Sequence, residues 1–315
     1  MKVDLTTTIK GLKFKNPVTV ASGTFGTTDE YSGYVDPKNL GAIITKTITV
    51  KPRAGNPMPR ICETSAGMLN AIGLQNKGLE DFLEHKIPYF KKLGVPLIVS
   101  FAGETTAEFA ELAKAFDRHR DVVSALEVNL SCPNVEAAGV SGMKKLDRIL
   151  DAVKAVRAGT KLLTFAKLSP ELGDVLAIAG AILKQGIDGL SVMNTLRGMS
   201  VDIRSRSSRL AKDFGGLSGP AIKPVALRYV YQVKKEFQVP VIASGGIADV
   251  KDALEFLIVG ADLLAVGTAN FVEPAATREI LKGITVFCQK EKIRNIGELR
   301  GSYNPAEEKG LGCAS

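Results

Sequence analysis

The sequence predicts an α/β fold, a (β/α)8 TIM barrel with an N-terminal hairpin, on three observations. Short β-branched runs recur at even intervals, helical patterns lie between them, and polar residues gather where the runs end. Parallel strands that alternate with helices in this way close into a barrel. Since none of the 315 residues forms a linker rich in Pro, Gly or Ser, we expect a single domain over residues 1–315.

The predicted strands are nearly continuous apolar runs, which is typical of parallel strands covered on both faces. They span residues 16–25, 42–49, 96–103, 125–132, 162–169, 189–196, 240–246 and 263–270. The residues before them, 6–15, alternate in polarity around Gly11 and predict a hairpin that closes the bottom of the barrel.

The predicted helices have apolar residues at i, i+3 and i+4, so each presents one face to the barrel. They span residues 79–93, 107–119, 146–156, 175–185, 224–237, 250–260 and 277–290. Thr105 or Thr106 is suited to cap the second of these helices, and Asp249 the sixth. Gly186 and Gly260 follow helices where a left-handed residue is favoured.

Two connections are longer than the repeat requires: residues 133–145 after the fourth strand and 197–223 after the sixth. Both follow the carboxyl ends of strands, where barrels carry their chemistry, and loops of this length are usually functional or mobile. The second is either a solvated loop or a lid that attracts anions, because it contains Arg197, Arg204, Arg206, Arg209 and Lys212.

Composition excludes several classes of protein. Lys and Arg number 41 against 33 Asp and Glu, a net charge of +8, but they are scattered among acids without interleaved aromatic residues. We therefore expect no nucleic-acid partner, and interpret the charge as solvated surface, attraction of small anions, or both. No stretch approaches the ~18 consecutive apolar residues of a membrane span, and no signal peptide is recognised. These features predict a cytoplasmic protein without membrane contact.

Histidine and cysteine usage narrows the chemistry. The 4 cysteines are far apart and form no CxxC pair, which favours reduced thiols over a disulfide framework or a zinc site. The 2 histidines, His85 and His119, are assigned to solvated positions in helices. We expect no metal and no catalytic histidine.

The carboxyl ends of the predicted strands carry polar side chains, and in a barrel these ends meet on one face. The last two strands end in SGG (244–246) and GT (267–268), whose glycines either let backbone N–H groups approach a phosphate or serve only as turns. The other strand ends carry Ser22, Lys46, Thr47, Ser100, Asn129, Lys167, Asn194 and Thr195.

Two lysines and one turn predict an anionic ligand. A buried ammonium group requires a negative partner, so Lys46 and Lys167 imply an anion unless their side chains reach solvent. Residues 67–74 follow the second predicted strand and contain a glycine turn after Asn70, either a plain turn or one whose successive N–H groups bind a carboxylate.

The segment NLSCPN at 129–134 combines two amides with a thiol. Asn129 and Asn134 can each donate and accept, which suits the edge of a uracil-like ring. Cys132 is either a small buried apolar residue or a base whose pKa is lowered by the nearby lysines.

Six motifs identify a resemblance to a known family. They are NAIGLQN (70–76), NLSCPN (129–134), VMNTLRGM (192–199), GGLSGPAIKPVALR (215–228), SGGI (244–247) and VGTANF (266–271). From about residue 4 to 290 the chain resembles class 1 dihydroorotate dehydrogenases, and within them the class 1B catalytic subunit. The resemblance implies an FMN-containing barrel that oxidises (S)-dihydroorotate to orotate in pyrimidine biosynthesis.

The resemblance also implies roles for individual residues. Cys132 would remove the C5 proton, hydride would pass from C6 to flavin N5, and Lys167 would face flavin N1 and O2. The substrate would contact Lys46, Asn70, Ala71, Ile72, Gly73, Leu74, Asn129, Asn134, Asn194 and Thr195. FMN would contact Ser22, Lys46, Thr47, Ser100, Asn129, Lys167, Met193, Gly219, Gly245, Gly246, Gly267 and Thr268.

Two positions depart from the family pattern, and the resemblance implies partners. Ser100 stands where the class often has Asn, and the loop within 135–143 lacks an expected aromatic residue. Class 1B enzymes have a homodimeric core and a second subunit with FAD and an iron–sulfur cluster that passes electrons to NAD; this chain has neither a cluster motif nor GxGxxG. Alternatives are a dihydropyrimidine or uracil-type flavin oxidoreductase, class 1A-like use of fumarate, a non-redox barrel isomerase or aldolase, and an FMN electron-transfer module.

Overall fold

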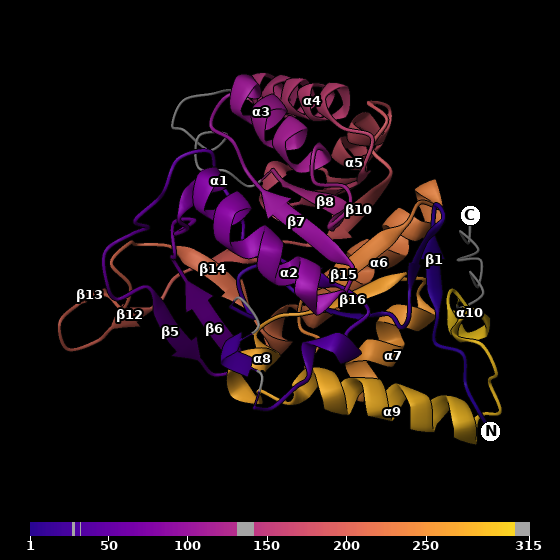
Figure 1. The fold of residues 1–315 in the computed structure, drawn as a ribbon. Helices are drawn as coiled ribbons and strands as arrows, with labels where there is room; N and C mark the ends of the chain where they lie inside the picture. The colour runs from indigo at the N-terminus through magenta and orange to yellow at the C-terminus, as the bar shows by residue number, and fades with distance from the viewer. Residues whose placement is uncertain (27–28, 32, 131–141, 306–315) are drawn as a thin grey trace, which may run out of the picture.

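Eight parallel strands form a barrel in the computed structural model, which describes residues 1–26, 29–31, 33–130 and 142–305 (Figure 1). In sheet order they are β3 (Val18–Val20), β16 (Leu263–Val266), β15 (Val241–Ser244), β10 (Gly189–Val192), β9 (Leu163–Leu168), β8 (Val123–Asn129), β7 (Leu97–Phe101) and β4 (Ile43–Ile44). All eight predicted strands and the predicted (β/α)8 barrel are confirmed.

The seam between β3 and β4 closes the barrel through two hydrogen bonds. The Gly41 N–H donates to the Val18 carbonyl at 2.8 Å, and the Thr19 hydroxyl donates to the Ala42 carbonyl at 2.8 Å. Between these strands the chain forms the 3-10 turns η1 (Asp29–Tyr31) and η2 (Pro37–Asn39). The ends of the eight-stranded order are thereby joined.

The N-terminal hairpin closes the bottom of the barrel, as predicted. Strands β1 (Thr7–Ile9) and β2 (Leu12–Phe14) pair across Lys10 and Gly11, and Ile9 and Phe14 are buried against the inward residues of the barrel strands. Those inward residues include Ala125, Phe165, Ile242 and Leu263. The lower half of the barrel is therefore a packed apolar core.

Helices surround the strands in Figure 1. Helix α8 (Ala269–Val272) overlaps the end of the last predicted strand, and α10 (Ile296–Leu299) was not predicted. The remaining helices each overlap a predicted one. They are α1 (Gly78–Asp81), the π-helical turn η3 (Phe82–Lys86), α2 (Ile87–Leu93), α3 (Thr106–Asp117), α4 (Gly142–Gly159), α5 (Val175–Leu183), α6 (Lys223–Phe237), α7 (Val250–Ile258) and α9 (Ala276–Lys290). Thr105 caps α3 by accepting from the Glu108 N–H, and Asp249 caps α7 with a capping box. His119 follows α3 instead of lying within it, because that helix ends two residues earlier.

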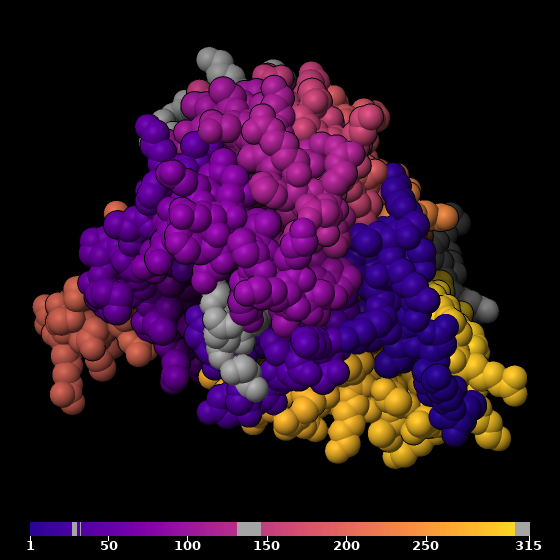
Figure 2. Space-filling model, in the orientation of Figure 1, coloured from indigo at the N-terminus to yellow at the C-terminus, as the bar shows by residue number. Residues whose placement is uncertain are grey.

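A second, antiparallel sheet was not predicted. Its order is β11 (Leu196–Gly198), β14 (Gly215–Ser218), β6 (Gly67–Asn70) and β5 (Ile61–Thr64). Within 67–74 a strand therefore runs up to Asn70, before the expected turn, and the expected loop at 197–223 contains β11, β14, the hairpin of β12 (Val201–Asp202) with β13 (Ser207–Ser208), and the 3-10 turn η5 (Pro220–Ile222). These strands are two to four residues long and rich in Gly and Ser, so they lack the alternation that marks a strand. Figure 2 shows the β12–β13 segment projecting from the body of the molecule.

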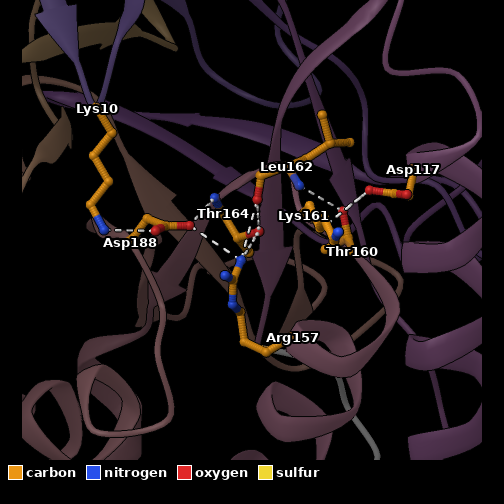
Figure 3. Close-up of polar contacts among 8 residues, drawn as sticks. All are labelled: Lys10, Asp117, Arg157, Thr160, Lys161, Leu162, Thr164 and Asp188. Carbon is orange, nitrogen blue, oxygen red and sulfur yellow. Dashed lines mark hydrogen bonds and ion pairs between the residues drawn. The ribbon is translucent and has the colours of Figure 1, made fainter.

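Polar contacts fasten the hairpin turn and α4 to the barrel (Figure 3). Asp188 lies 2.7 Å from the Lys10 ammonium and 3.2 Å from the Arg157 guanidinium, and it accepts from the Thr164 N–H at 2.9 Å. Beside it, Asp117 accepts from the Thr160 hydroxyl and the Lys161 N–H, both at 2.9 Å. Among the described residues, no helix combines the length and apolarity needed to cross a bilayer.

The Asp117 carboxylate makes the stability of the fold depend on pH in the acid range. Burial raises its pKa, but hydrogen bonds from Lys161, Thr160 and Arg120 outweigh burial and hold the pKa below 3.8. Because the folded-state pKa is depressed, its contribution of about 1 kcal/mol is present at neutral pH and is lost as pH falls through that lowered pKa.

The Asp117→Asn variant should therefore lose less stability than the wild type between pH 7 and pH 3, measured by urea unfolding. Asp151→Asn is the matched control, because the Asp151 side chain is 62% exposed. Equal losses in wild type and Asp117→Asn would contradict the prediction.

Candidate active site

A large pocket lies over the carboxyl ends of the barrel strands, with a volume of about 1560 Å³. Residues at the ends of every barrel strand except β7 line it, and the antiparallel sheet supplies one wall through segments 61–64, 67–70 and 214–219. The unpredicted sheet thus builds one wall of the site. A pocket in this position is where a parallel barrel carries its ligand.

The pocket gathers most of the residues predicted from the sequence. Those that line it are Ser22, Lys46, Thr47, Asn70, Ala71, Ile72, Gly73, Leu74, Asn129, Lys167, Met193, Asn194, Thr195, Gly219, Gly245, Gly246, Gly267 and Thr268. Cys132, Asn134 and residues 133–141 of the expected long loop at 133–145 lie outside the described residues, whereas residues 142–145 already belong to helix α4 and do not continue the loop. Ser100, predicted as a direct cofactor contact, does not line the pocket; it is fully buried beneath it and is linked to the pocket through a hydrogen bond with Thr47.

A network of hydroxyl and amide groups forms the floor. The Thr47 hydroxyl lies 3.1 Å from the Ser22 hydroxyl and accepts from the Asn129 amide at 3.2 Å. The Asn194 amide donates to Asn129 Oδ1 at 3.4 Å, and its own oxygen accepts from the Thr195 N–H at 2.8 Å. These contacts orient the two amide groups, which suits them to read the edge of a polar ring.

An ion pair lies at the base of this floor. Lys167 Nζ is 3.6 Å from Glu127 Oε1, and the two side chains are 10% and 2% exposed. Glu127 also accepts from the Ser100 hydroxyl at 3.0 Å and from the Ser191 hydroxyl at 2.8 Å. Sequence reasoning missed Glu127, although a charged residue within the apolar run 125–130 was a usable signal.

Lys46 approaches the pocket from the end of β4. Burial lowers its pKa, and the positive charge of Arg60 lowers it further. Arg60 was not predicted; it donates to the carbonyls of Asn56 and Ala54 and to the Gln75 amide oxygen, which ties residues 54–60 to the segment after β6. Lys46 and Arg60 together add positive charge to the side of the pocket next to Lys46, which we call the positive wall.

The segment after β6 turns sharply beside that positive wall. Gly73 and Leu74 adopt φ values of 75° and 56°, and a Cβ on Gly73 would lie 2.8 Å from the Asn56 nitrogen. The turn therefore begins after Asn70, and only glycine fits at position 73. Its position among the pocket residues suits the predicted carboxylate contact.

Glycines make close backbone approaches at the opposite end of the pocket. A Cβ on Gly246 would lie 2.7 Å from the Lys223 nitrogen, and one on Gly219 would lie 2.6 Å from the Gly67 Cα. The short helix α8 (Ala269–Val272) follows Thr268, whose hydroxyl donates to the Ser218 hydroxyl at 2.8 Å. Gly245, Gly246, Gly267 and Thr268 line the pocket here, which suits the phosphate contact predicted from the sequence. In the described part of the chain, no cluster of His, Cys, Asp or Glu resembles a metal site.

The fold and the pocket together define a parallel α/β barrel with a large, polar ligand pocket at the carboxyl ends of its strands. The chain belongs to the dihydroorotate dehydrogenase family, a family of oxidoreductases, whose sequence profile matches residues 4–287.

Relatives of nearly full length support this assignment. The chain is 49% identical to "Dihydroorotate dehydrogenase B (NAD(+)), catalytic subunit" of Desulforamulus reducens, over 96% of this chain and 99% of that protein. A protein of the same name from Pelobacter propionicus is 47% identical with the same coverage. Among solved structures, ligand-free type DHODH from Eimeria tenella superposes with a TM-score of 0.78 at 26% identity, covering 96% of this chain and 92% of that one.

Substitution of Gly246 tests whether the glycine-lined end of the pocket requires close backbone packing. Gly246→Ala should lower the unfolding temperature and weaken ligand binding, because the new Cβ meets the Lys223 backbone at a φ of 78°. Gly94→Ala is the matched control: its φ is 69°, but its Cβ would meet nothing within 4 Å, so backbone strain alone should cost about 1 kcal/mol. Thermal unfolding measures both variants. An equal fall in unfolding temperature for Gly246→Ala and Gly94→Ala would contradict the inferred steric clash with the Lys223 backbone.

Proposed function

We propose that the chain is the FMN-dependent catalytic subunit of a B-type dihydroorotate dehydrogenase, which oxidises (S)-dihydroorotate to orotate in de novo pyrimidine biosynthesis. The observation that carries the proposal is the convergence of the buried Lys167 cation, the Asn129 and Asn194 amides and the glycine-lined end in one pocket. The names of the near full-length relatives agree with this activity. We propose further that residues 1–315 form one domain and that the protein is cytoplasmic.

The pocket fits FMN together with a small acid. Its volume of about 1560 Å³ exceeds the roughly 300–1,000 Å³ of a site for one small ligand. Gly245, Gly246, Gly267 and Thr268 would hold the phosphate, and Gly219, whose Cβ would lie 2.6 Å from the Gly67 Cα, allows the neighbouring wall to pack closely. Ser22, Lys46, Thr47, Asn129, Lys167 and Met193 would contact the rest of the cofactor, with Ser100 behind Thr47. When bound, FMN supplies the acceptor for hydride from C6 of the substrate.

The chain's own residues position the substrate and move one proton. The Lys46 ammonium and the backbone at Ala71, Ile72, Gly73 and Leu74 would meet the substrate carboxylate beside the positive wall. Asn70, Asn129, Asn134, Asn194 and Thr195 would hold the edges of the pyrimidine ring. Cys132, as thiolate, would take the proton from C5. The Lys167 ammonium would stabilise the negative charge that the flavin gains as it accepts hydride.

Electrons would leave through a partner protein. The relatives are named as NAD(+) enzymes and as catalytic subunits, which supports a second subunit here. We propose that this subunit carries FAD and an iron–sulfur cluster, that it passes electrons to NAD, and that the catalytic chain forms a homodimer. Phe271 and Val272, which are 53% and 81% exposed at the rim of the pocket, are apolar side chains suited to such an interface.

Anaerobic mixing with dihydroorotate tests the function and the base together. The flavin of the wild-type protein should bleach, and Cys132→Ser should slow bleaching by about 100-fold or more at pH 7, because a hydroxyl is a far weaker base than a thiolate. Cys62→Ser is the matched control, since Cys62 also lines the pocket but on the antiparallel sheet.

Stopped-flow absorbance measures both rates. A flavin-loaded wild type that dihydroorotate does not bleach would overturn the function, and an unchanged rate in Cys132→Ser would remove Cys132 as the base.

A further inference from the structure

Glu127 is the most buried acidic side chain among the described residues, and the roles proposed above leave it unused. It lies in the middle of β8, with Ala125 below it in the apolar core and Asn129 above it at the pocket. Side chains at alternate positions of a strand share one face, so β8 presents an apolar, an acidic and an amide layer in turn to the barrel interior. The acid therefore lies directly under the site.

The surroundings of Glu127 form a built receptor for its carboxylate. Ser100 of β7 and Ser191 of β10 donate to its two oxygens at 3.0 and 2.8 Å, and Lys167 of β9 lies 3.6 Å away. Two strands thus supply hydrogen-bond donors, and a third supplies the cation. Removing a carboxylate from water without such partners would cost several kcal/mol. The hydrogen bonds and the ammonium group are therefore what allows Glu127 to be buried here.

Lys167 lies between the carboxylate and the pocket. Lys167 lines the pocket and Glu127 does not, so a bound ligand meets the ammonium first and the carboxylate behind it. The pair has no net charge, and Glu127 weakens the positive potential that Lys167 presents to the ligand. The carboxylate also fixes the ammonium at the base of the pocket, where an unpaired lysine could turn toward solvent.

We propose that Glu127 is a positioning and charge-compensating residue for Lys167, and that it sets the reduction potential of bound FMN below the value that Lys167 alone would give. The inference rests on the proposed function, since it requires FMN in this pocket. Two-electron reduction with uptake of one proton leaves flavin with one negative charge. A nearby carboxylate disfavours that form, whereas the lysine favours it.

The test is a redox titration of bound FMN against a reference dye, carried out at one fixed pH for all variants. At the potential where wild-type FMN is half reduced, Glu127→Gln should raise the ratio of reduced to oxidised flavin by about tenfold or more, because it removes the charge and keeps the shape. Glu127→Asp keeps the charge and shortens the side chain, so its ratio should stay close to that of the wild type.

The two variants separate charge from packing. If Glu127 had a purely structural role, the shorter Asp would change the ratio of reduced to oxidised flavin more than the isosteric Gln, and that result would overturn the proposal. An unchanged or lowered ratio in Glu127→Gln would overturn it as well. If the wild type fails to retain FMN, the proposed function is overturned as well; equal ratios in FMN-loaded proteins overturn this inference alone.

The double variant Lys167→Met/Glu127→Gln keeps the proposal testable if Glu127→Gln does not fold. Replacing both partners of a buried pair is often neutral for stability. Because the pair as a whole carries no charge, the reduced-to-oxidised ratio should stay within about tenfold of the wild type. A larger fall would show that Lys167 acts without compensation, which contradicts the proposal.

Discussion

The ion pair of Lys167 and Glu127 is the constraint on which the site depends. The lower barrel is a dry apolar core, and an ammonium can be held at its upper surface only with an opposite charge and hydrogen bonds around it. Ser100 and Ser191 complete that shell, and Ser100 continues it through Thr47 to Ser22 in the floor of the pocket. The change from apolar core to reactive pocket is therefore made in one layer of side chains.

Above this layer, backbone shape decides what the pocket accepts. The antiparallel sheet built from residues 61–70 and 196–218 forms one wall, and its glycines allow a backbone approach that a Cβ would block at Gly67 and Gly219. Arg60 ties the neighbouring loop to the turn at Gly73 while adding positive charge near Lys46. One end of the pocket thus suits a phosphate and the other a carboxylate.

The barrel and most of the site could be predicted from the sequence, because buried parallel strands are apolar runs and polar residues at their ends stand out. The antiparallel sheet could not, since strands such as 67–70 and 215–218 are four residues long, contain glycine and do not alternate between buried and exposed positions. Glu127 was not predicted because it lies inside a strand and not at its end. Its partners come from three strands that only the folded barrel brings together. Arg60 acts through loop carbonyls, which no sequence pattern marks.

A crystal structure of the purified chain with FMN and orotate would test the central claim most directly. The account predicts the flavin phosphate against Gly245, Gly246 and Gly267, and the Lys167 ammonium within hydrogen-bond distance of flavin N1 or O2. It also predicts that the ammonium remains within about 4 Å of the Glu127 carboxylate, as an ion pair requires. A flavin placed elsewhere, or a Lys167 side chain turned away from both the flavin and Glu127, would contradict the account.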